Sequence, residues 1–141
     1  KVARWRKIAE EASRQSGRSV IPVVHEPVDF KFFIKHMEHF ERNVDTVKRR
    51  HGEIKGFIFW EEGGLSLNDA IRKLSPSPIH RFTASPLHLI IGPEGGFTKE
   101  EVTLAKEKGL LTISLGKRIL RAETAAISAV TLIQFLLGDM G

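Results

Sequence analysis

The sequence predicts an α/β fold in which a mostly parallel sheet is flanked by helices. Short apolar runs such as "GFIF" and "LHLII" alternate along the chain with segments whose apolar residues recur at helical spacing. Such alternation is typical of parallel strands joined by crossover helices, which cover both faces of the sheet. With 141 residues, 41% of them hydrophobic, the chain is long enough to bury one core of this kind.

The start of the chain predicts a helix followed by a strand. The helix spans residues 1–17 and ends at Gly17, and its apolar residues share one face, where we expect Trp5 to belong to the core. The segment "SVIPVV", residues 19–24, has the composition of a short strand. Its internal Pro22 favours an edge position or a strand end, because proline has no backbone N–H to donate.

A second helix and a buried strand are predicted next. Residues 29–42 carry a possible N-cap, Asp29, ahead of apolar residues at helical spacing. Residues 43–53 are polar and basic, which indicates a loop, and "KGFIFWEE", residues 55–62, indicates a short buried strand. The apolar residues that define the helix are Phe30, Phe33, Ile34 and Met37.

The middle of the chain predicts a helix, a connection and a strand. In "SLNDAIRKL", residues 66–74, Ser66 and Asp69 have the spacing of a capping box. The next segment, residues 75–86, contains too many prolines to form a regular element. The apolar run "LHLII", residues 87–91, then predicts a strand.

The last third of the chain repeats the alternation. Thr98 and Glu101 form a second capping box, so a helix is expected over residues 98–109, ending at a glycine. "LLTISLG", residues 110–116, predicts another strand, and "TAAISAVTLIQFLL", residues 124–137, predicts a final helix that is apolar almost all round. A helix of that composition needs neighbours on more than one side.

Composition excludes several kinds of site. Without cysteine, the chain can form neither a disulfide nor a thiolate metal site, and its six histidines do not form a ligand pair beside carboxylates, so no metal is expected. The 22 Lys and Arg against 17 Asp and Glu give a net charge of +5, which favours a polyanionic partner. No apolar run approaches the ~20 residues that cross a bilayer, and no signal peptide is evident, so we expect a cytoplasmic protein without a membrane partner.

Two unusual loops follow strands and are expected to form one pocket. "GPEGGF", residues 92–97, follows one predicted strand, and "LGKRILRAET", residues 115–124, follows the next. In open α/β sheets, ligands bind beyond the carboxyl ends of the strands, where these loops lie. The glycines could simply turn the chain tightly, as many strand-to-helix junctions require. Three glycines and a proline in one short loop favour a ligand site over that explanation.

The chemistry of the first loop favours an adenosyl cofactor over a phosphate. The spacing of a phosphate-binding loop and its lysine are missing, and Glu94 would repel a phosphate. Glu100 and Glu101 already place negative charge at the start of the following helix. A loop with bare backbone and a carboxylate suits a ligand with positive charge, ribose hydroxyls and an adenine edge. S-adenosylmethionine has all of these groups.

The sequence resembles a known family at both loops. "LIIGPEGGFTKEE" followed by "SLGKRILRAETAAISA" is similar to the signature pair of the RsmE family, and "RWRKIAEEASRQSGRSVIP" is similar to the start of its catalytic domain. These enzymes methylate N3 of a uridine in 16S rRNA. The resemblance implies the SPOUT methyltransferase fold with a C-terminal deep trefoil knot, S-adenosylmethionine bound in the knot, and a homodimer packed through the C-terminal helix. It also implies a PUA-like RNA-binding domain ahead of the catalytic one, and we expect this chain, residues 1–141, to be the SPOUT domain without it.

The resemblance also implies roles for individual residues. Glu94 would orient the loop or meet polar groups of the cofactor, and Thr124 would cap the last helix, with any cofactor contact secondary. The residues expected at the cofactor are Gly92, Pro93, Glu94, Gly95, Gly96, Leu115, Gly116, Ile119, Leu120 and Thr124.

Arg121 and Glu123 are the candidate catalytic residues. A guanidinium at Arg121 can bond a uracil oxygen as it becomes anionic. Glu123 could be the base that removes the N3 proton, or simply a stabilising carboxylate at a helix N-terminus, and both interpretations remain open. The residues expected to touch RNA are Lys117, Arg118, Arg4 and Arg14, with a further basic run at residues 48–50.

Three other functions remain possible from the sequence. A related SPOUT enzyme could act on tRNA, because the physics of the two loops would serve either RNA. A non-catalytic RNA-binding module could keep the fold without turnover, and would then fail to bind the methyl donor. A nucleotide-binding protein would prefer ATP to the methyl donor, and the carboxylates of the first loop argue against it.

Overall fold

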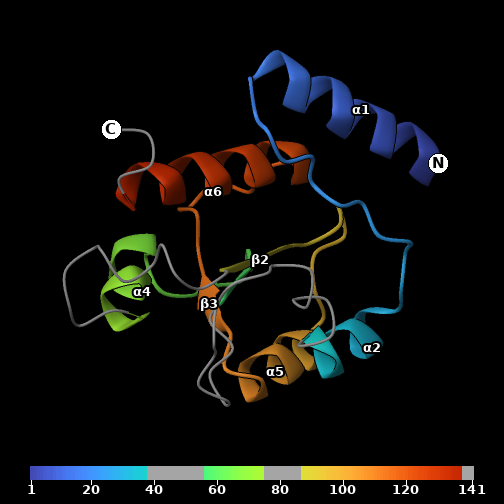
Figure 1. The fold of residues 1–141 in the computed structure, drawn as a ribbon. Helices are drawn as coiled ribbons and strands as arrows, with labels where there is room; N and C mark the ends of the chain where they lie inside the picture. Colours follow the sequence, from blue (N-terminus) through green and yellow to red (C-terminus); the bar gives the residue numbers. More distant parts are fainter. Residues whose placement is uncertain (38–55, 75–86, 138–141) are drawn as a thin grey trace.

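A three-stranded parallel sheet forms the centre of the molecule (Figure 1). The computed structural model describes residues 1–37, 56–74 and 87–137. The strands β1 (Gly56–Phe59), β2 (His88–Ile91) and β3 (Leu111–Ile113) are arranged in the order β2-β1-β3. The predicted α/β class, with a parallel sheet flanked by helices, is confirmed.

The central strand β1 is buried along its whole length. In the register of the sheet, Phe59 pairs with Ile91 on one side and with Ile113 on the other. All four β1 residues are buried, because the strand has a neighbour at each edge and helices over both faces. This burial explains why "GFIF" is a continuous apolar run without polar alternation.

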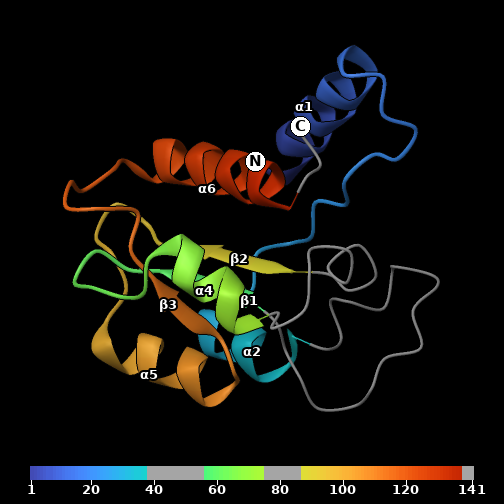
Figure 2. The ribbon, with the colours of Figure 1, turned by 90° about the vertical axis from the view of Figure 1, so that its left-hand side faces the viewer.

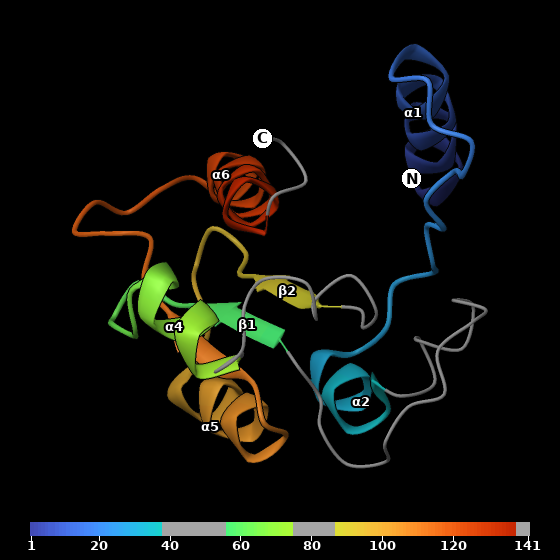
Figure 3. The same ribbon diagram turned by 60° about the vertical axis from the view of Figure 1, so that its left-hand side comes forward.

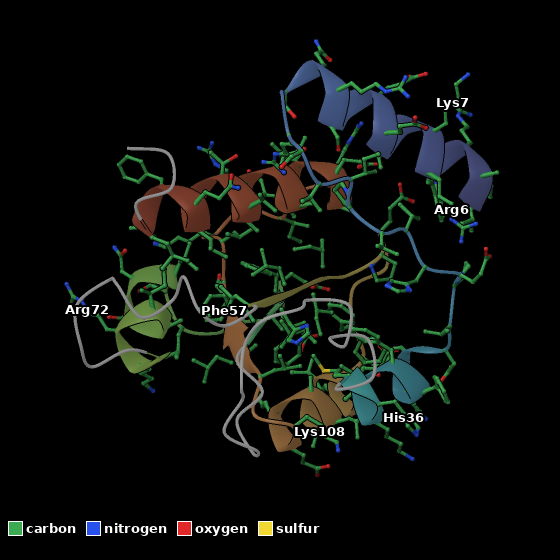
Figure 4. The ribbon with its side chains drawn as sticks, in the orientation of Figure 1. Arg6, Lys7, His36, Phe57, Arg72 and Lys108 are labelled. Atoms are coloured by element: carbon green, nitrogen blue, oxygen red, sulfur yellow. The ribbon has the colours of Figure 1, made fainter. Side chains whose placement is uncertain are left out.

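Two apolar clusters pack against opposite faces of the sheet (Figures 2 and 3). Ile58 points to the face covered by α2 (Phe30–Lys35) and α5 (Lys99–Glu107). Its neighbours Phe57 and Phe59 point to the other face, covered by α4 (Leu67–Leu74) and α6 (Ala122–Leu136), and Figure 4 shows Phe57 in the interior. The first cluster buries Ile34, Met37, Ile58, Val102, Ala105 and Leu110; the second buries Phe57, Phe59, Ala70, Ile113, Ala129 and Ile133.

The predicted helix starts are confirmed at three places. The Asp29 carboxylate accepts from the backbone N–H of Phe32 at 3.1 Å, so it caps α2. The Ser66 hydroxyl accepts from the backbone N–H of Asp69 at 3.2 Å, ahead of α4.

The capping box of α5 is complete. Thr98 and Glu101 exchange two hydrogen bonds, of 2.9 and 3.2 Å, between the side chain of one and the backbone N–H of the other. At the same helix start, a backbone N–H and the Thr98 side chain lower the pKa of Glu100 below its usual value. The side chains thus satisfy backbone donors that the first helical turn leaves open.

The start of the chain differs from the prediction. Helix α1 (Val2–Gln15) forms as expected, but it lies away from the sheet and Trp5 is 44% exposed, so its assignment to the core is wrong. Residues 19–24 form no strand, and Val20 and Val23 are 75% and 64% exposed. The segment leaves α1 and runs outside the sheet, where no described strand is available to pair with it.

Three smaller boundaries also differ. The last helix begins at Ala122, with Arg121 as its N-cap, so Thr124 lies inside the first turn and does not cap it. Strand β3 ends at Ile113, because the chain then turns toward Gly116. Helix α2 ends at Lys35, with His36 as its C-cap, so it is shorter than the helix predicted over 29–42. The predicted loop at 43–53 and the connection at 75–86 lie outside the described residues.

Candidate functional site

A cleft of about 650 Å³ opens at the carboxyl edge of the sheet. Three segments line it: 59–61 after β1, 91–96 after β2, and 113–125 after β3. The two loops that the sequence singled out therefore share one cleft. Its volume lies within the range of about 300–1,000 Å³ that is typical of small-molecule sites.

The glycine loop after β2 is a tight turn that packs on the core. The backbone N–H of Gly96 donates to the Pro93 carbonyl at 2.9 Å, which closes the turn, and Gly96 has a φ of 71°, a value that favours glycine. At Gly92, a side chain would begin 3.1 Å from the ring of Phe97. That ring packs on Phe30, with centroids 5.3 Å apart. The loop is thereby anchored to the core and presents its backbone to the cleft.

The loop after β3 forms the opposite wall. The Ser114 hydroxyl accepts from the Gly116 N–H at 3.3 Å, which fixes the turn where the strand ends. Beyond it, Ile119 is 84% exposed and Leu120 is 36% exposed, although both line the cleft. Two large apolar side chains at the mouth of a cleft are available to cover a ligand.

Unpaired charges of both signs line the cleft. The acidic residues Glu61 and Glu94 follow β1 and β2, whereas the basic residues all lie in the segment 117–121. Among the residues that the structure describes, none of these groups makes an ion pair with a neighbour. The cleft therefore has an acidic wall and a second wall, called the basic wall below, in which three basic residues precede Glu123. The charged lining residues are Glu61, Glu94, Lys117, Arg118, Arg121 and Glu123.

Most of the predicted site residues lie in this cleft, but not all. Gly95 does not line it, and Thr124 is exposed in the first turn of α6 without lining it. Arg4 and Arg14 are on α1, which contributes nothing to the cleft, and Arg14 pairs with Glu10 on its own helix. The predicted residues that do line the cleft are Gly92, Pro93, Glu94, Gly96, Leu115, Gly116, Lys117, Arg118, Ile119, Leu120, Arg121 and Glu123. Their functional roles remain predictions.

Among the residues after β1, the sequence indicates that Trp60 could line the pocket but favours a packing role for it, and Glu61 is not predicted as a site residue. Trp60 and Glu61 line the cleft because β1 is the central strand, so its carboxyl end lies between the two loops. The Trp60 backbone N–H donates to the Ile113 carbonyl at 3.0 Å, and the Lys106 Nζ lies 5.9 Å from the centre of its ring. The only sequence signal was the pair of glutamates directly after an apolar run.

Two further searches of the described residues gave no site. No group of three or more His, Cys, Asp or Glu residues in that part of the chain could hold a metal ion. None of the described helices is long and apolar enough to span a membrane.

Comparison with known proteins connects the cleft to a family. Residues 1–134 match the family described as RNA methyltransferase domain. The ribosomal RNA small subunit methyltransferase E of Bacillus subtilis is 34% identical over 94% of this chain and 46% of its own length, and that of Synechocystis sp. is 36% identical over 97% and 39%. The chain therefore spans less than half the length of these relatives.

A solved structure shows the same arrangement of the chain. The ribosomal RNA small subunit methyltransferase E of Neisseria gonorrhoeae, crystallised with S-adenosyl methionine, aligns with a TM-score of 0.71 and 30% identity over 96% of this chain and 47% of its own. These matches confirm the resemblance seen in the two loops. With residues 1–134 of 141 matched, the chain belongs to the RNA methyltransferase domain family.

Proposed function

We propose that this chain is the catalytic part of an S-adenosylmethionine-dependent enzyme that methylates N3 of a uridine in small-subunit (16S) ribosomal RNA. The observation that carries the proposal is the single cleft shared by the glycine turn and the 115–123 loop, with one acidic and one basic wall. The relatives named above are ribosomal RNA small subunit methyltransferases, and the Neisseria protein holds the methyl donor. A knotted C-terminal segment and action in the cytoplasm are parts of the same proposal.

The lining of the cleft suits the methyl donor. Bare backbone at Gly116, where nothing lies within 4 Å of the position that a side chain would take, leaves room for an adenosyl group, and Leu115, Ile119 and Leu120 supply apolar walls. The unpaired carboxylates of the acidic wall complement a positive ligand and would repel a triphosphate. When bound, the cofactor supplies an electrophilic methyl group.

The basic wall suits the RNA side of the reaction. The uridine N3 proton must leave before the nitrogen can attack, so the site has to accept that proton and stabilise negative charge on the ring. Arg121, the N-cap of α6, would bond a uracil oxygen, and Glu123, in the first turn, would accept the proton. Lys117 and Arg118 would hold neighbouring phosphates.

An exposed apolar stripe on α6 supports a homodimer. Ala129 and Ile133 hold the helix on the sheet, yet Ile127, Val130 and Phe135 on the other side are 69%, 44% and 64% exposed. Their spacing follows one face of a helix. A second copy of the chain packed along α6 would cover this stripe.

The proposal is tested by methyl transfer to RNA. The purified protein, in excess over its RNA substrate, is incubated with labelled S-adenosylmethionine and, in parallel reactions, with small ribosomal subunits or total tRNA from a strain that lacks the homologous gene. We expect label in the small-subunit RNA, and nucleoside mass spectrometry should find N3-methyluridine. Label in tRNA instead would assign the enzyme to another RNA. Binding of the methyl donor without any transfer would favour a non-catalytic module.

A further inference from the structure

Two consecutive glutamates after β1 make different contacts. The Glu61 carboxylate lies on Gly96, so that a Cβ at position 96 would overlap its Oε1 and come within 2.8 Å of its Cδ. The next residue, Glu62, forms an ion pair with Lys99, with 4.0 Å between Oε2 and Nζ. Only Glu61 lines the cleft.

Glu61 has no partner in the described part of the chain, unlike most glutamates nearby. Glu62 pairs with Lys99, and the Glu101 carboxylate accepts from the Thr98 N–H. The N–H of Gly96, the residue against which the carboxylate lies, is already bonded to the Pro93 carbonyl. The Glu61 side chain is exposed and its carboxylate lies against Gly96, so it keeps its hydrogen-bonding capacity for a ligand.

The position of Glu61 indicates which part of a ligand it would meet. It lines the acidic wall of the cleft and lies against Gly96 of the glycine loop, whereas the basic residues of the cleft all lie in the segment 117–121. A positive group on the ligand is favoured on this wall and disfavoured on the other. S-adenosylmethionine carries a positively charged sulfur, whereas the sulfur of its demethylated product is neutral.

We propose that Glu61 is a cofactor-site residue whose negative charge attracts the positively charged sulfur of the methyl donor. It would therefore bind the methyl donor more tightly than the demethylated product, whose sulfur is neutral. This inference rests on the proposed function. Glu61 follows the central strand β1 and belongs to neither of the two loop motifs, so the inference adds a residue to the site that determines which ligand binds. Replacement by glutamine keeps the shape that packs on Gly96 and removes only the charge.

The chain contains a natural probe of the cleft. It has two tryptophans: Trp60 lines the cleft, and Trp5 lies on α1, which contributes no lining residue. A Trp5→Phe variant therefore has Trp60 as its only indole. Its fluorescence reports occupancy of the cleft without any methyl transfer, and calorimetry on the same samples gives an independent affinity.

The test measures both ligands in the Trp5→Phe background. We expect Glu61→Gln to weaken S-adenosylmethionine binding about tenfold, since one close charge interaction at a solvent-accessible site is worth about that much, and to weaken S-adenosylhomocysteine binding less than about threefold. The matched control is Glu62→Gln, which changes the adjacent glutamate outside the cleft and should alter each affinity less than about twofold. Circular dichroism checks that each variant is folded, and Glu61→Ala repeats the measurement without the carboxylate.

Each other outcome has a distinct meaning. If Glu61→Gln weakens the binding of both ligands equally, the proposal is overturned, because the carboxylate would then contact a group that the two ligands share and not the charged sulfur. Unchanged affinity for both would remove Glu61 from the site altogether. If the Trp5→Phe parent binds neither ligand, the proposed function itself fails, and the inference fails with it.

Discussion

The first and last helices of the chain have similar lengths but different environments. Helix α6, 15 residues long, rests on the sheet through Ala129 and Ile133 and begins at the cleft. Helix α1, 14 residues long, buries only Ser13 and lies apart from the sheet, with Arg6 and Lys7 at the outside of the molecule (Figure 4). Both expose apolar side chains: Ile127 and Phe135 on α6, and the residues of one α1 face.

The comparison of α1 with α6 shows that having an apolar face and having a known partner for that face are separate properties of a helix. The pattern predicts that a helix has a face to cover, and it does so correctly for both helices. It does not say what covers that face. On α6, one face meets β2 and the other is exposed, and we propose that a second copy of the chain packs on it. On α1, Trp5 and Ile8 are 44% and 51% exposed, so in this chain their hydrophobic surface contributes little to stability.

The largest expected effect is on folding. Ile133→Ala removes a buried side chain between α6 and the sheet and should lower the free energy of unfolding by about 2–5 kcal/mol. Ile8→Ala makes a similar truncation on α1 and should cost less than about 1 kcal/mol, because its side chain is half exposed. Urea unfolding of both variants measures the difference. Equal losses would mean that α1 packs in solution as α6 does.

The next effect is on catalysis. Arg121→Ala should lower kcat for methyl transfer about 100-fold, the loss typical of one removed charge-stabilising donor, with little change in stability, because Arg121 makes no side-chain cap on α6. Arg4→Ala on α1 should leave kcat unchanged and raise KM for RNA a few-fold, since a phosphate contact affects binding alone. The comparison is read from initial rates at several RNA concentrations. A fall in kcat for Arg4→Ala would place α1 at the reaction.

Glu123 tests whether the start of α6 supplies a base. Glu123→Gln should lower kcat at least about tenfold and remove the acidic limb of the pH–rate profile, because a base works only when deprotonated. If Glu123 only complements the helix dipole, kcat should stay within about twofold of the parent and the free energy of unfolding should fall by about 0.3–1 kcal/mol. The pH profile is the deciding measurement, since a structural role leaves its shape unchanged.

Local chemistry explains which parts of the fold could be predicted. The box of Thr98 and Glu101 and the cap at Asp29 are decided within four residues, so the sequence contains all that is needed. The prediction of a strand over residues 19–24 is wrong because a strand also needs a neighbouring strand to pair with, and the described sheet offers none there. Thr124 failed as a cap because Ala122 and Glu123 extend the helix backward to Arg121.

The site residues that lie in a single loop could be predicted from the sequence, whereas those that reach the cleft only through the order of the strands could not. The glycine turn and the loop after β3 carry unusual residues in sequence, and both were found. Trp60 and Glu61 carry no such signal. They enter the cleft because the order β2-β1-β3 puts the end of β1 between those loops, and this order is a property of the whole sheet.

The exposed stripe of α6 predicts a change in oligomeric state. Ile127→Asp places a charge in the middle of the stripe and should raise the dimer dissociation constant at least about tenfold, with little loss of monomer stability because the residue is 69% exposed. Ile8→Asp on α1 is the matched control and should not change the dimer. Sedimentation velocity at several concentrations gives both constants. A dimer that tolerates the charge at 127 but not at 8 would move the interface to α1.

The smallest expected effect concerns the charges of α1. Arg14 and Glu10 form an ion pair one turn apart, with side chains 74% and 41% exposed. Such a pair stabilises a helix by only about 0.3–0.5 kcal/mol, because water and salt screen it. Glu10→Gln should therefore change the free energy of unfolding by no more than that amount, and 0.5 M salt should remove most of the difference between variant and parent. A larger change that survives salt would show that Glu10 is buried in solution, which requires a partner on α1. Since the same helix carries Trp5 and Ile8, that result would identify α1 as a second interface and its apolar face as the surface that the partner covers.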